Sequence, residues 1–541
     1  MPEVEQILSY QRKVLYQNDY FEIVSINWLN TSVSKMHNHG WSQCMVLVEE
    51  GTFENTLYMG GKTEIQIFEA GQIISTPVGA KHEVRCLSLT GKTLHVYTPK
   101  IFAHQDQGIF KIELTPELKN NFLLSEPESI DSLKGILNEI REKSITTNSP
   151  YFMNQLFSGI MPQALLAETL VAETKTTLAT NEASLIFSKI ETEVIESLSK
   201  IIGWQSSTSE GICVPGGSAA NFMAIHCARQ KMFPDFKMTG MNGKRLLVFV
   251  SSAAHYSLKK ACVTLGLGMN NLVIIPTDEN DRMQPYALEQ LINQHKLNGA
   301  IPLLVCATAG TTVFGSFDPI DELAIICKKY DIWLHADAVW GGPALFSKNT
   351  QHLLKGIEQA DSVSIDAHKL FGASLTCSFY LSKIPGLLLE ANDVSGGDYI
   401  FHSKNEIDRG KMSWQCGRKA DAMSFWSIWK SLGTEGLGQF VDRLINVRNQ
   451  TVEWVNTESR FEVVSAPDYL NLCLRINPPL NNPSTSSEWA LYVRETLINK
   501  NLAMVNYAKD ENGYFLRLIF AHPDLEFVHV KQILQWALEI E

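Results

Sequence analysis

Residues 361–370 read Asp-Ser-Val-Ser-Ile-Asp-Ala-His-Lys-Leu, and they follow the apolar stretch Ile-Trp-Leu-His-Ala-Asp at 332–337 by one further strand and loop. An aspartate directly after a strand is usually a helix cap or a turn residue. The lysine downstream changes that interpretation, because a lysine can hold the aldehyde of pyridoxal phosphate (PLP) as a Schiff base while a carboxylate keeps the ring nitrogen protonated. Asp337 and Lys369 therefore predict a PLP site at the strand ends of an α/β domain.

Length and composition restrict the kind of protein. The chain has 541 residues, which is too long for one compact core and predicts at least two domains. Hydrophobic residues make up 45% and charged residues 19%, so long disordered segments are not expected. The net charge of −12 argues against a nucleic-acid surface, which needs clustered Lys and Arg. Chemistry on a small molecule is the more natural expectation.

Targeting signals and disulfide patterns are missing from the sequence. The start, Met-Pro-Glu-Val-Glu, has no basic region followed by an apolar run, and no apolar stretch is long enough to span a bilayer. The ten cysteines contain no Cys-x-x-Cys pair, which in a chain of this size predicts reduced thiols. We therefore expect a cytoplasmic protein that does not bind membranes.

The character of the chain changes along its length. Residues 20–100 carry short alternating apolar segments separated by Gly and Asn turns, which is typical of a small β-barrel. Residues 116–147 then become helical and charged, with a helix start expected at 115–118. We divide the chain into a barrel over 1–115, a helical linker with the first segment of the next domain over 116–204, a large domain over 205–424 and a small C-terminal domain over 425–541.

The large domain alternates apolar strands with amphipathic helices, which predicts a parallel sheet with helical crossovers. The expected strands cover 245–251, 271–276, 301–306 and 332–336, and the expected helices cover 256–265, 286–295 and 318–330.

Further candidates for the PLP site follow other strands. Gly216, Gly217 and Ser218 precede a helical run, and glycines followed by free helix N–H groups make a phosphate cradle. His255 follows an expected strand and suits stacking on the cofactor ring, although its structural alternative is a polar residue at a helix start. Thr312 is a further polar candidate.

Together these residues resemble the group II PLP decarboxylases, a fold type I (aspartate aminotransferase-like) family that includes glutamate and cysteine sulfinate decarboxylases. The resemblance covers about residues 148–540. Its motifs are Pro-Tyr-Phe-Met-Asn-Gln-Leu-Phe-Ser-Gly at 150–159, Pro-Gly-Gly at 215–217, Ala-His-Tyr-Ser at 254–257, Ala-Gly-Thr-Thr at 309–312, the Asp337 and Lys369 motifs, and Gln-Cys-Gly-Arg at 415–418.

The resemblance implies a role for each matching residue. Lys369 is the Schiff-base lysine, Asp337 the partner of the pyridinium nitrogen and His255 the ring-stacking residue. The phosphate-side residues and the residue near the ring oxygen are Gly217, Ser218, Asp366 and Thr312. Arg517 falls where family members bind a substrate carboxylate, and a guanidinium fork suits that task. Gln155 and Phe157 fall in the substrate-binding stretch, where Phe157 is similar to cysteine sulfinate decarboxylases.

Three positions depart from the family pattern. Val339 stands where relatives carry a small alanine beneath the ring. Asp366 and Ala367 replace the frequent Asn-Pro, which adds a negative charge near the phosphate. Ile407 replaces a loop aromatic residue implicated in reprotonation, so His368 or His255 would have to donate the proton.

Residues 1–115 carry a second set of candidates. His37 and His39 lie two apart in an expected strand and His82 follows a turn, so three imidazoles can converge on iron or zinc. The spacing resembles the cupin motifs, and Cys44, which replaces the usual glutamate ligand, makes the domain similar to cysteine dioxygenase. That similarity implies Fe(II) held by His37, His39 and His82. It further implies a Cys44–Tyr97 crosslink with His95 beside it, and Arg12 as a carboxylate binder.

The two halves predict one reaction sequence. A thiol dioxygenase would make cysteine sulfinate from cysteine, and a decarboxylase would convert cysteine sulfinate to hypotaurine. We therefore expect a bifunctional enzyme. The resemblance to fold type I enzymes implies that it forms a homodimer. One alternative is a glutamate, aspartate or diaminobutyrate decarboxylase with a structural cupin domain, and another is a cupin domain that senses a small molecule.

Overall fold

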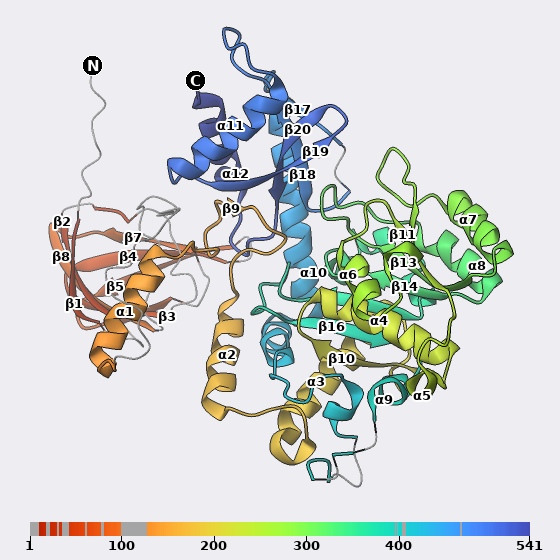
Figure 1. The fold of residues 1–541 in the computed structure, drawn as a ribbon. Coiled ribbons are helices and arrows are strands. Elements are labelled where there is room, and N and C mark those ends of the chain that lie inside the picture. Colours follow the sequence, from red (N-terminus) through yellow and green to blue (C-terminus); the bar gives the residue numbers. More distant parts are fainter. Residues whose placement is uncertain are drawn as a thin grey trace. The chain divides into compact units, whose positions relative to one another are not determined.

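The computed structural model describes residues 10–17, 22–29, 32–34, 43–59, 62–76, 81–98 and 127–541, the last range without 395, 398, 403–406 and 466–467. The chain divides into two compact units, residues 1–107 and 108–541 (Figure 1). Each unit has an apolar core of its own. Within the described residues, the length and apolar character needed to cross a bilayer are found in no helix.

The first unit consists of two antiparallel sheets. The larger sheet contains, in spatial order, Tyr10–Gln17 (β1), Glu22–Leu29 (β2), Thr90–Thr98 (β8), Gln43–Glu50 (β3) and Ile73–Thr76 (β6). The smaller sheet contains Lys62–Glu69 (β5), Thr52–Met59 (β4) and Lys81–Cys86 (β7).

The two sheets of the first unit share one core. On β2 the side chains of Val24, Ile26 and Trp28 are buried at every second position, as a half-buried strand requires. Trp28 meets Phe53 of β4 edge to face, with ring centroids 5.5 Å apart. The predicted β-rich N-terminal domain is therefore confirmed. The closed cupin barrel stays a prediction, because the described strands form two separate sheets.

The second unit is built on a seven-stranded sheet in the order β10-β16-β15-β14-β13-β11-β12. The strands are Glu210–Val214 (β10), Leu246–Ser251 (β11), Leu272–Ile275 (β12), Ile301–Thr308 (β13), Trp333–Asp337 (β14), Ser362–Asp366 (β15) and Ser378–Ser382 (β16). Strand β16 is antiparallel to both neighbours, and the strands from β15 to β12 pair in parallel. This arrangement confirms the predicted parallel sheet with crossovers.

Helices between the strands complete the large sheet's layers (Figure 1). Helix α4 packs against α6 and α9 and lies over the strands from β10 to β13, while α7 and α8 pack on β12, β13 and β14. Their bounds are Gly217–Met232 (α4), Phe236–Thr239 (α5), Ser257–Thr264 (α6), Pro285–Leu297 (α7), Ile320–Tyr330 (α8) and Leu387–Asn392 (α9).

A second sheet in this unit joins distant parts of the chain. It contains Phe461–Val463 (β17), Asn471–Ile476 (β18), Gly513–Ile519 (β20), Met504–Asp510 (β19) and Phe152–Met153 (β9), in that order. Strand β9 pairs in parallel with β19, which fixes residues 150–158 to the C-terminal part of the chain. Helix α10 (Ala422–Val455) runs across the domain boundary that we placed at 424/425.

The remaining helices are Ile130–Lys143 (α1), Pro162–Thr174 (α2), Asn181–Ile202 (α3), Ser486–Asn499 (α11) and Phe527–Glu539 (α12). Helix α1 lies within the predicted helical segment 116–147 and is capped by the Ser129 hydroxyl. The helix start expected at residues 115–118 lies outside the described residues.

A buried ion cluster ties α3 to the sheet and to the Gln-Cys-Gly-Arg stretch. Glu191 is 0% exposed and accepts hydrogen bonds from Arg418 Nη2 at 2.7 Å and from the Cys213 backbone N–H at 2.7 Å. Arg409 Nη1 lies 3.6 Å from the same oxygen. Burial by itself would raise the pKa of the Glu191 carboxyl, but the charges of Arg418 and Arg409 outweigh burial and hold that pKa below its usual value.

We predict that Arg418→Met lowers the free energy of unfolding at pH 7 by about 3–5 kcal/mol, because it leaves a buried carboxylate with a weaker partner. Lys419→Met is the control, since its ion pair with Glu168 is half exposed and such pairs contribute about 1 kcal/mol or less. Urea denaturation followed by circular dichroism measures both variants.

The pH dependence follows from the lowered pKa of Glu191. The cluster's contribution is present above the unfolded-state pKa, about 4.3, and is lost as the pH falls through the lower folded-state value. The difference between wild type and Arg418→Met should therefore narrow below about pH 4. An Arg418→Met loss no larger than that of Lys419→Met would contradict this account.

Candidate active site

The ends of the parallel strands meet at one edge of the large sheet. The register aligns Thr308 of β13 with Asp337 of β14, and Asp337 with Ser364 of β15. The loops that leave this edge carry His255 after β11 and Lys369 after β15. The predicted site residues are therefore neighbours in space because their strands are neighbours in the sheet.

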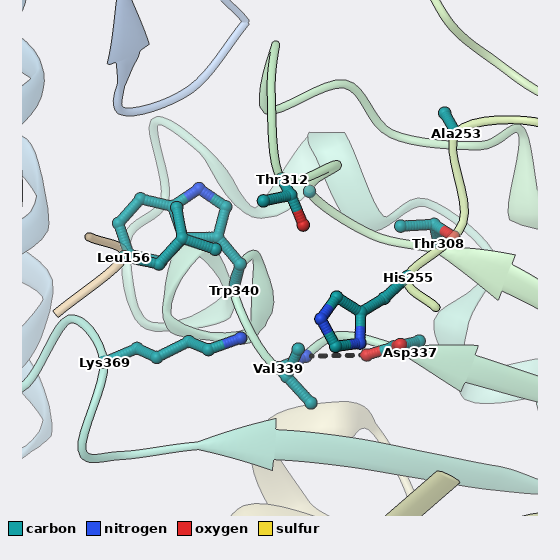
Figure 2. Close-up of a pocket in the computed structure, with 10 residues that line it drawn as sticks. Leu156, Ala253, His255, Thr308, Thr312, Asp337, Val339, Trp340 and Lys369 are labelled. Atoms are coloured by element: carbon teal, nitrogen blue, oxygen red, sulfur yellow. Dashed lines mark hydrogen bonds between the residues drawn. The ribbon is translucent and has the colours of Figure 1, made fainter. Parts of the chain in front are cut away.

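A pocket with about 280 Å³ of empty space lies at this edge. Figure 2 shows the Lys369 side chain extended into the pocket, toward the side where His255 and Asp337 lie. Thr312 lies above His255 in the same view and also lines the pocket. The full lining consists of Leu156, Ala253, His255, Thr308, Gly310, Thr312, Asp337, Val339, Trp340 and Lys369. The structure thus brings together the predicted lysine, carboxylate, imidazole and threonine.

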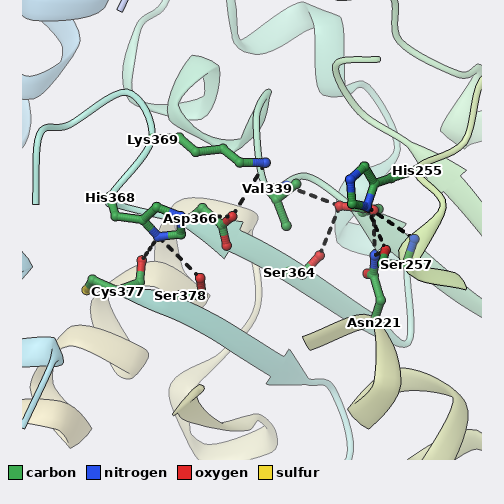
Figure 3. A network of polar contacts seen from close by, with 11 residues as sticks. Asn221, His255, Ser257, Val339, Ser364, Asp366, His368, Lys369, Cys377 and Ser378 are labelled. Atoms are coloured by element: carbon green, nitrogen blue, oxygen red, sulfur yellow. Dashed lines mark hydrogen bonds and ion pairs between the residues drawn. The ribbon is translucent and has the colours of Figure 1, made fainter. Parts of the chain in front are cut away.

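Asp337 is a buried carboxylate surrounded by hydrogen-bond donors. Its side chain is 2% exposed, and Asn221 Nδ2 donates to its Oδ2 at 2.7 Å. The Val339 backbone N–H and the Ser364 hydroxyl each donate to Oδ1 at 3.4 Å (Figure 3). All three groups donate, so the Asp337 oxygens act as acceptors in this network, which is the role that pairing with a protonated ring nitrogen requires.

His255 is held by the start of α6. Ser257 contacts His255 Nδ1 twice, through its hydroxyl at 2.9 Å and its backbone N–H at 3.3 Å (Figure 3). Burial lowers the pKa of His255, and the nearby Asp337 only partly offsets the effect. The ring is therefore predominantly neutral at pH 7, which suits a residue that lies flat against an aromatic cofactor.

Lys369 and its neighbour His368 both lie close to the buried carboxylate of Asp366. Asp366 is 1% exposed, and its Oδ2 lies 3.5 Å from Lys369 Nζ and 3.6 Å from His368 Nε2 (Figure 3). Its Oδ1 is buried without a hydrogen-bond partner in the described part of the chain. His368 Nδ1 donates to the Cys377 carbonyl at 3.0 Å, so its ring faces β16 and does not line the pocket.

The first turn of α4 provides a narrow cradle. A Cβ on Gly217 would meet Val339 Cγ1 at 2.7 Å and Asp366 Oδ2 at 3.0 Å, so only glycine fits this close approach. Gly216, the N-cap residue of α4, has a φ of 95°, which favours glycine. Ser218, which follows Gly217, is exposed. The free N–H groups of this 16-residue helix suit a phosphate. The lysine, the buried carboxylate and this turn together fit PLP, although Asp366 adds a like charge beside the phosphate position.

The predicted substrate residues occupy different places. Leu156 forms part of the pocket wall, whereas Phe157 packs on Phe152 with ring centroids 6.2 Å apart and Gln155 is exposed. Phe157 and Gln155 are therefore not part of the wall. Leu156, which lies between them in a stretch where the chain bends, takes that position.

Arg517 lies behind the pocket on β20. Its Nη1 donates to the Thr312 carbonyl at 2.9 Å, and its Nη2 donates to the Asn154 carbonyl at 3.0 Å. The side chain is 6% exposed and does not line the pocket. Arg517 thus fixes the loops that carry Thr312 and Leu156, and its predicted contact with a substrate carboxylate stays a prediction.

The first unit brings together three of its predicted residues. Cys44 of β3 and Tyr97 of β8 are register partners, and His95 Nδ1 lies 3.1 Å from the Tyr97 hydroxyl and 3.9 Å from Cys44 Sγ. Burial raises the pKa of Cys44 to about 12, although a hydrogen bond with Tyr97 partly opposes this shift. The Cys44 thiol is therefore protonated at pH 7 and faces the tyrosine across the pair of strands.

The predicted metal site is only partly described. His82 is 1% exposed, and its Nδ1 lies 2.8 Å from Asn55 Oδ1. His37 and His39 lie outside the described residues, as does the side chain of Arg12. Among the described side chains, no group of three or more His, Cys, Asp or Glu could hold a metal ion. With one of three ligands described, iron at this site stays a prediction.

Some pocket and network residues were not predicted. Trp340 closes one wall and donates from its indole to Asn471 Oδ1 at 2.7 Å. Asn221 and His335 lie behind Asp337. His335 precedes Asp337 by two positions in the strand, so both side chains lie on the same face of the sheet. This spacing could have predicted that the two residues are close. Asn221 gave no such signal, because helix α4 brings it to Asp337 over a long sequence separation.

Comparison with known proteins agrees with this geometry. Residues 114–477 match the family model "Pyridoxal-dependent decarboxylase conserved domain". The cysteine sulfinic acid decarboxylase of Rattus norvegicus is 35% identical over 417 residues, which cover 74% of this chain and 84% of that protein. The acidic amino acid decarboxylase of Homo sapiens is 38% identical over 377 residues, which cover 67% and 72%.

A solved structure supports the same assignment. The crystal structure of mouse CSAD in its apo form is 33% identical and superimposes with a TM-score of 0.73 over 77% of this chain and 89% of that chain. The family match begins at residue 114, so the β-rich unit lies outside it. From the lysine-containing pocket and these matches, we conclude that the chain belongs to the family of pyridoxal-dependent decarboxylases.

Proposed function

We propose that this protein decarboxylates cysteine sulfinate to hypotaurine. The observation that carries the proposal is the pocket in which Lys369, Asp337 and His255 meet, in a chain 35% identical to a cysteine sulfinic acid decarboxylase. The acidic amino acid decarboxylase of similar identity supports an acidic amino acid as the substrate class.

Each pocket residue has a distinct proposed task. Lys369 would bind the aldehyde of PLP, Asp337 would accept a hydrogen bond from the protonated ring nitrogen, and His255 would cover one ring face. PLP supplies an electron sink for the pair released when the carboxylate leaves as CO₂. The walls formed by Leu156 and Trp340 would exclude water from the reacting carbon.

The proton that replaces CO₂ needs a donor. Of the two predicted candidates, His255 lines the pocket and His368 faces β16. His255 is thus the better placed donor. Ile407, which replaces the aromatic residue of the family, is half exposed and is not part of the pocket wall.

The N-terminal unit would supply the substrate. We propose that it adds both atoms of O₂ to the sulfur of cysteine, which yields cysteine sulfinate. The grouping of Cys44, His95 and Tyr97 supports this role, together with the buried His82. Fe(II) held by His37, His39 and His82 would bind O₂ and the thiolate of the substrate.

We also propose a cytoplasmic homodimer. Leucines on α2 are exposed in the single chain, with Leu165 at 45%, Leu166 at 70% and Leu170 at 41%. Ile186 of α3 is 63% exposed. Apolar surface of this kind on a helix is best explained by burial against a second copy.

The substrate prediction is tested by incubating the purified protein with L-cysteine, Fe(II) and PLP, in air and under argon. We expect hypotaurine from cysteine only in air, and hypotaurine from added cysteine sulfinate under both gases, because only the first step consumes O₂. Mass spectrometry identifies the products. The metal content of the protein and a parallel panel of glutamate, aspartate and diaminobutyrate serve as controls.

Two results would contradict parts of the proposal. Faster decarboxylation of glutamate, aspartate or diaminobutyrate than of cysteine sulfinate would favour the alternative substrates. Decarboxylation of cysteine sulfinate without any oxygen-dependent product from cysteine would leave the N-terminal unit with a structural or sensing role.

Asp366 provides a test of the phosphate position. We predict that Asp366→Asn lowers the Kd for PLP about tenfold, which corresponds to about 1.4 kcal/mol. The reason is that the substitution removes a buried negative charge beside both the phosphate cradle and Lys369 Nζ. Titration of the PLP-free protein, followed by the absorbance of lysine-bound PLP, measures the effect.

Asp361→Asn is the matched control, because Asp361 precedes the opposite end of β15 and bonds the Leu334 backbone N–H at 2.8 Å. It should leave the Kd for PLP unchanged. Weaker PLP binding by Asp366→Asn would mean that the carboxylate helps to hold the cofactor and would contradict the assigned phosphate position.

A further inference from the structure

A buried chain of hydrogen bonds runs from the core of the large sheet to the active-site carboxylate. It begins at Trp333 on β14, passes through Ser362 on β15 and His335 on β14, and reaches Asn221 on α4. Asn221 then contacts both Asp337 and Ser257. None of the first four side chains lines the pocket, so they can affect the site only through the residues that they hold.

The chain starts at a group that can only donate. Trp333 is 7% exposed, and its indole N–H donates to Ser362 Oγ at 2.8 Å. The Ser362 oxygen therefore accepts on that side, and its own hydrogen is free for the second partner. That partner is His335 Nδ1, also at 2.8 Å. The Ser362 oxygen also keeps a second lone pair, so the direction of its bond to His335 is fixed from the other end of the chain, by Asn221.

The next link fixes a histidine tautomer. His335 is 0% exposed, and burial lowers its pKa to about 4, so the ring is neutral at pH 7 and carries one N–H. Asn221 turns its NH₂ group to the Asp337 carboxylate and therefore its oxygen to His335, so the proton is on Nε2 and Nδ1 accepts from Ser362. Nε2 then donates to Asn221 Oδ1 at 3.0 Å. The ring of Tyr380 packs beside His335, and a hydrogen bond with the Ser362 side chain partly opposes the burial that raises the pKa of Tyr380.

The amide of Asn221 divides the chain into two branches. Its oxygen is used by His335, so its NH₂ group faces the active site and donates to Asp337 Oδ2 at 2.7 Å and to Ser257 Oγ at 2.9 Å. Ser257 accepts there, and its hydroxyl hydrogen is directed to His255 Nδ1 at 2.9 Å. The Ser257 backbone N–H also points at that nitrogen, so neutral His255 carries its proton on Nε2 (Figure 3).

We propose that Trp333 and Ser362 are positioning residues that hold His335, and through it the Asn221 amide, in the hydrogen-bond order that Asp337 requires. In the resulting order Asp337 receives hydrogen bonds, and His255 presents a protonated Nε2. The reversed order would turn the Asn221 oxygen toward Asp337 and place two acceptors against each other. The inference rests on the proposed role of Asp337 as the partner of the PLP ring nitrogen.

Trp333→Phe tests the proposal, because it removes the indole N–H and keeps an aromatic ring in the core. We expect the Kd for PLP to rise about tenfold. In the PLP-free protein labelled with ¹⁵N-histidine, NMR should show His335 as the Nε2–H tautomer in wild type and as a mixture of tautomers in the variant. The His335 signal is assigned by its absence in His335→Gln.

Trp204→Phe is the matched control. Trp204 is 5% exposed, and its indole N–H donates to the Glu358 carbonyl at 2.9 Å, outside the chain. The control loses an equivalent buried bond and should keep the wild-type Kd for PLP and the wild-type His335 signal. Urea denaturation verifies that both variants are folded.

Ser362→Ala replaces Trp333→Phe if the latter does not fold. Its control is Ser382→Ala, since Ser382 is the cross-strand register partner of Ser362, is equally buried and bonds only within its own loop. We expect PLP binding to be weaker in Ser362→Ala than in wild type and unchanged in Ser382→Ala.

Two results would overturn the proposal. One is a wild-type His335 protonated on Nδ1 or on both nitrogens. The other is a Kd for PLP in Trp333→Phe equal to that of wild type. A wild-type protein that does not bind PLP would instead refute the proposed function and would leave the tautomer measurement valid.

Discussion

Burial of the Asp337 carboxylate is the constraint on which the site depends. A carboxyl group that is 2% exposed needs donors to replace water, and here they come from α4, β15 and its own loop. The adjacent strands and the first turns of α4 must therefore hold fixed positions. The close approach at Gly217, and the ion cluster at Glu191 that bonds the end of β10, maintain this packing.

The same constraint separates what the pocket residues do from what the supporting residues do. Lys369, His255 and Thr312 reach the pocket from loops at the strand ends, where their side chains can contact a ligand. Asn221 and Arg517 stay behind the wall, where they hold Asp337 and the Thr312 loop in place. The residues that can contact a ligand thus line the pocket, and the residues that hold them in place lie behind its wall.

Sequence patterns predicted the large sheet well, because strands buried on both faces are continuous apolar runs and their ends carry the site residues. They failed where side-chain direction decides the outcome. The motif pointed to Phe157, but Leu156, in a bend of the chain, lies in the pocket wall. The motif arginine Arg418 proved to be the partner of buried Glu191, and its role depends on a contact between distant segments. In the first unit, the buried polar Asn55 interrupts the apolar alternation of β4, which hides that strand from pattern analysis.

The proposed function depends on the binding of PLP to Lys369 beside Asp337. Reducing the PLP-loaded protein with borohydride, digesting it and locating the pyridoxyl group by mass spectrometry tests this binding. We expect a stoichiometric label on Lys369 and none on the other lysines. A label on a different lysine, or no label after loading with PLP, would contradict it.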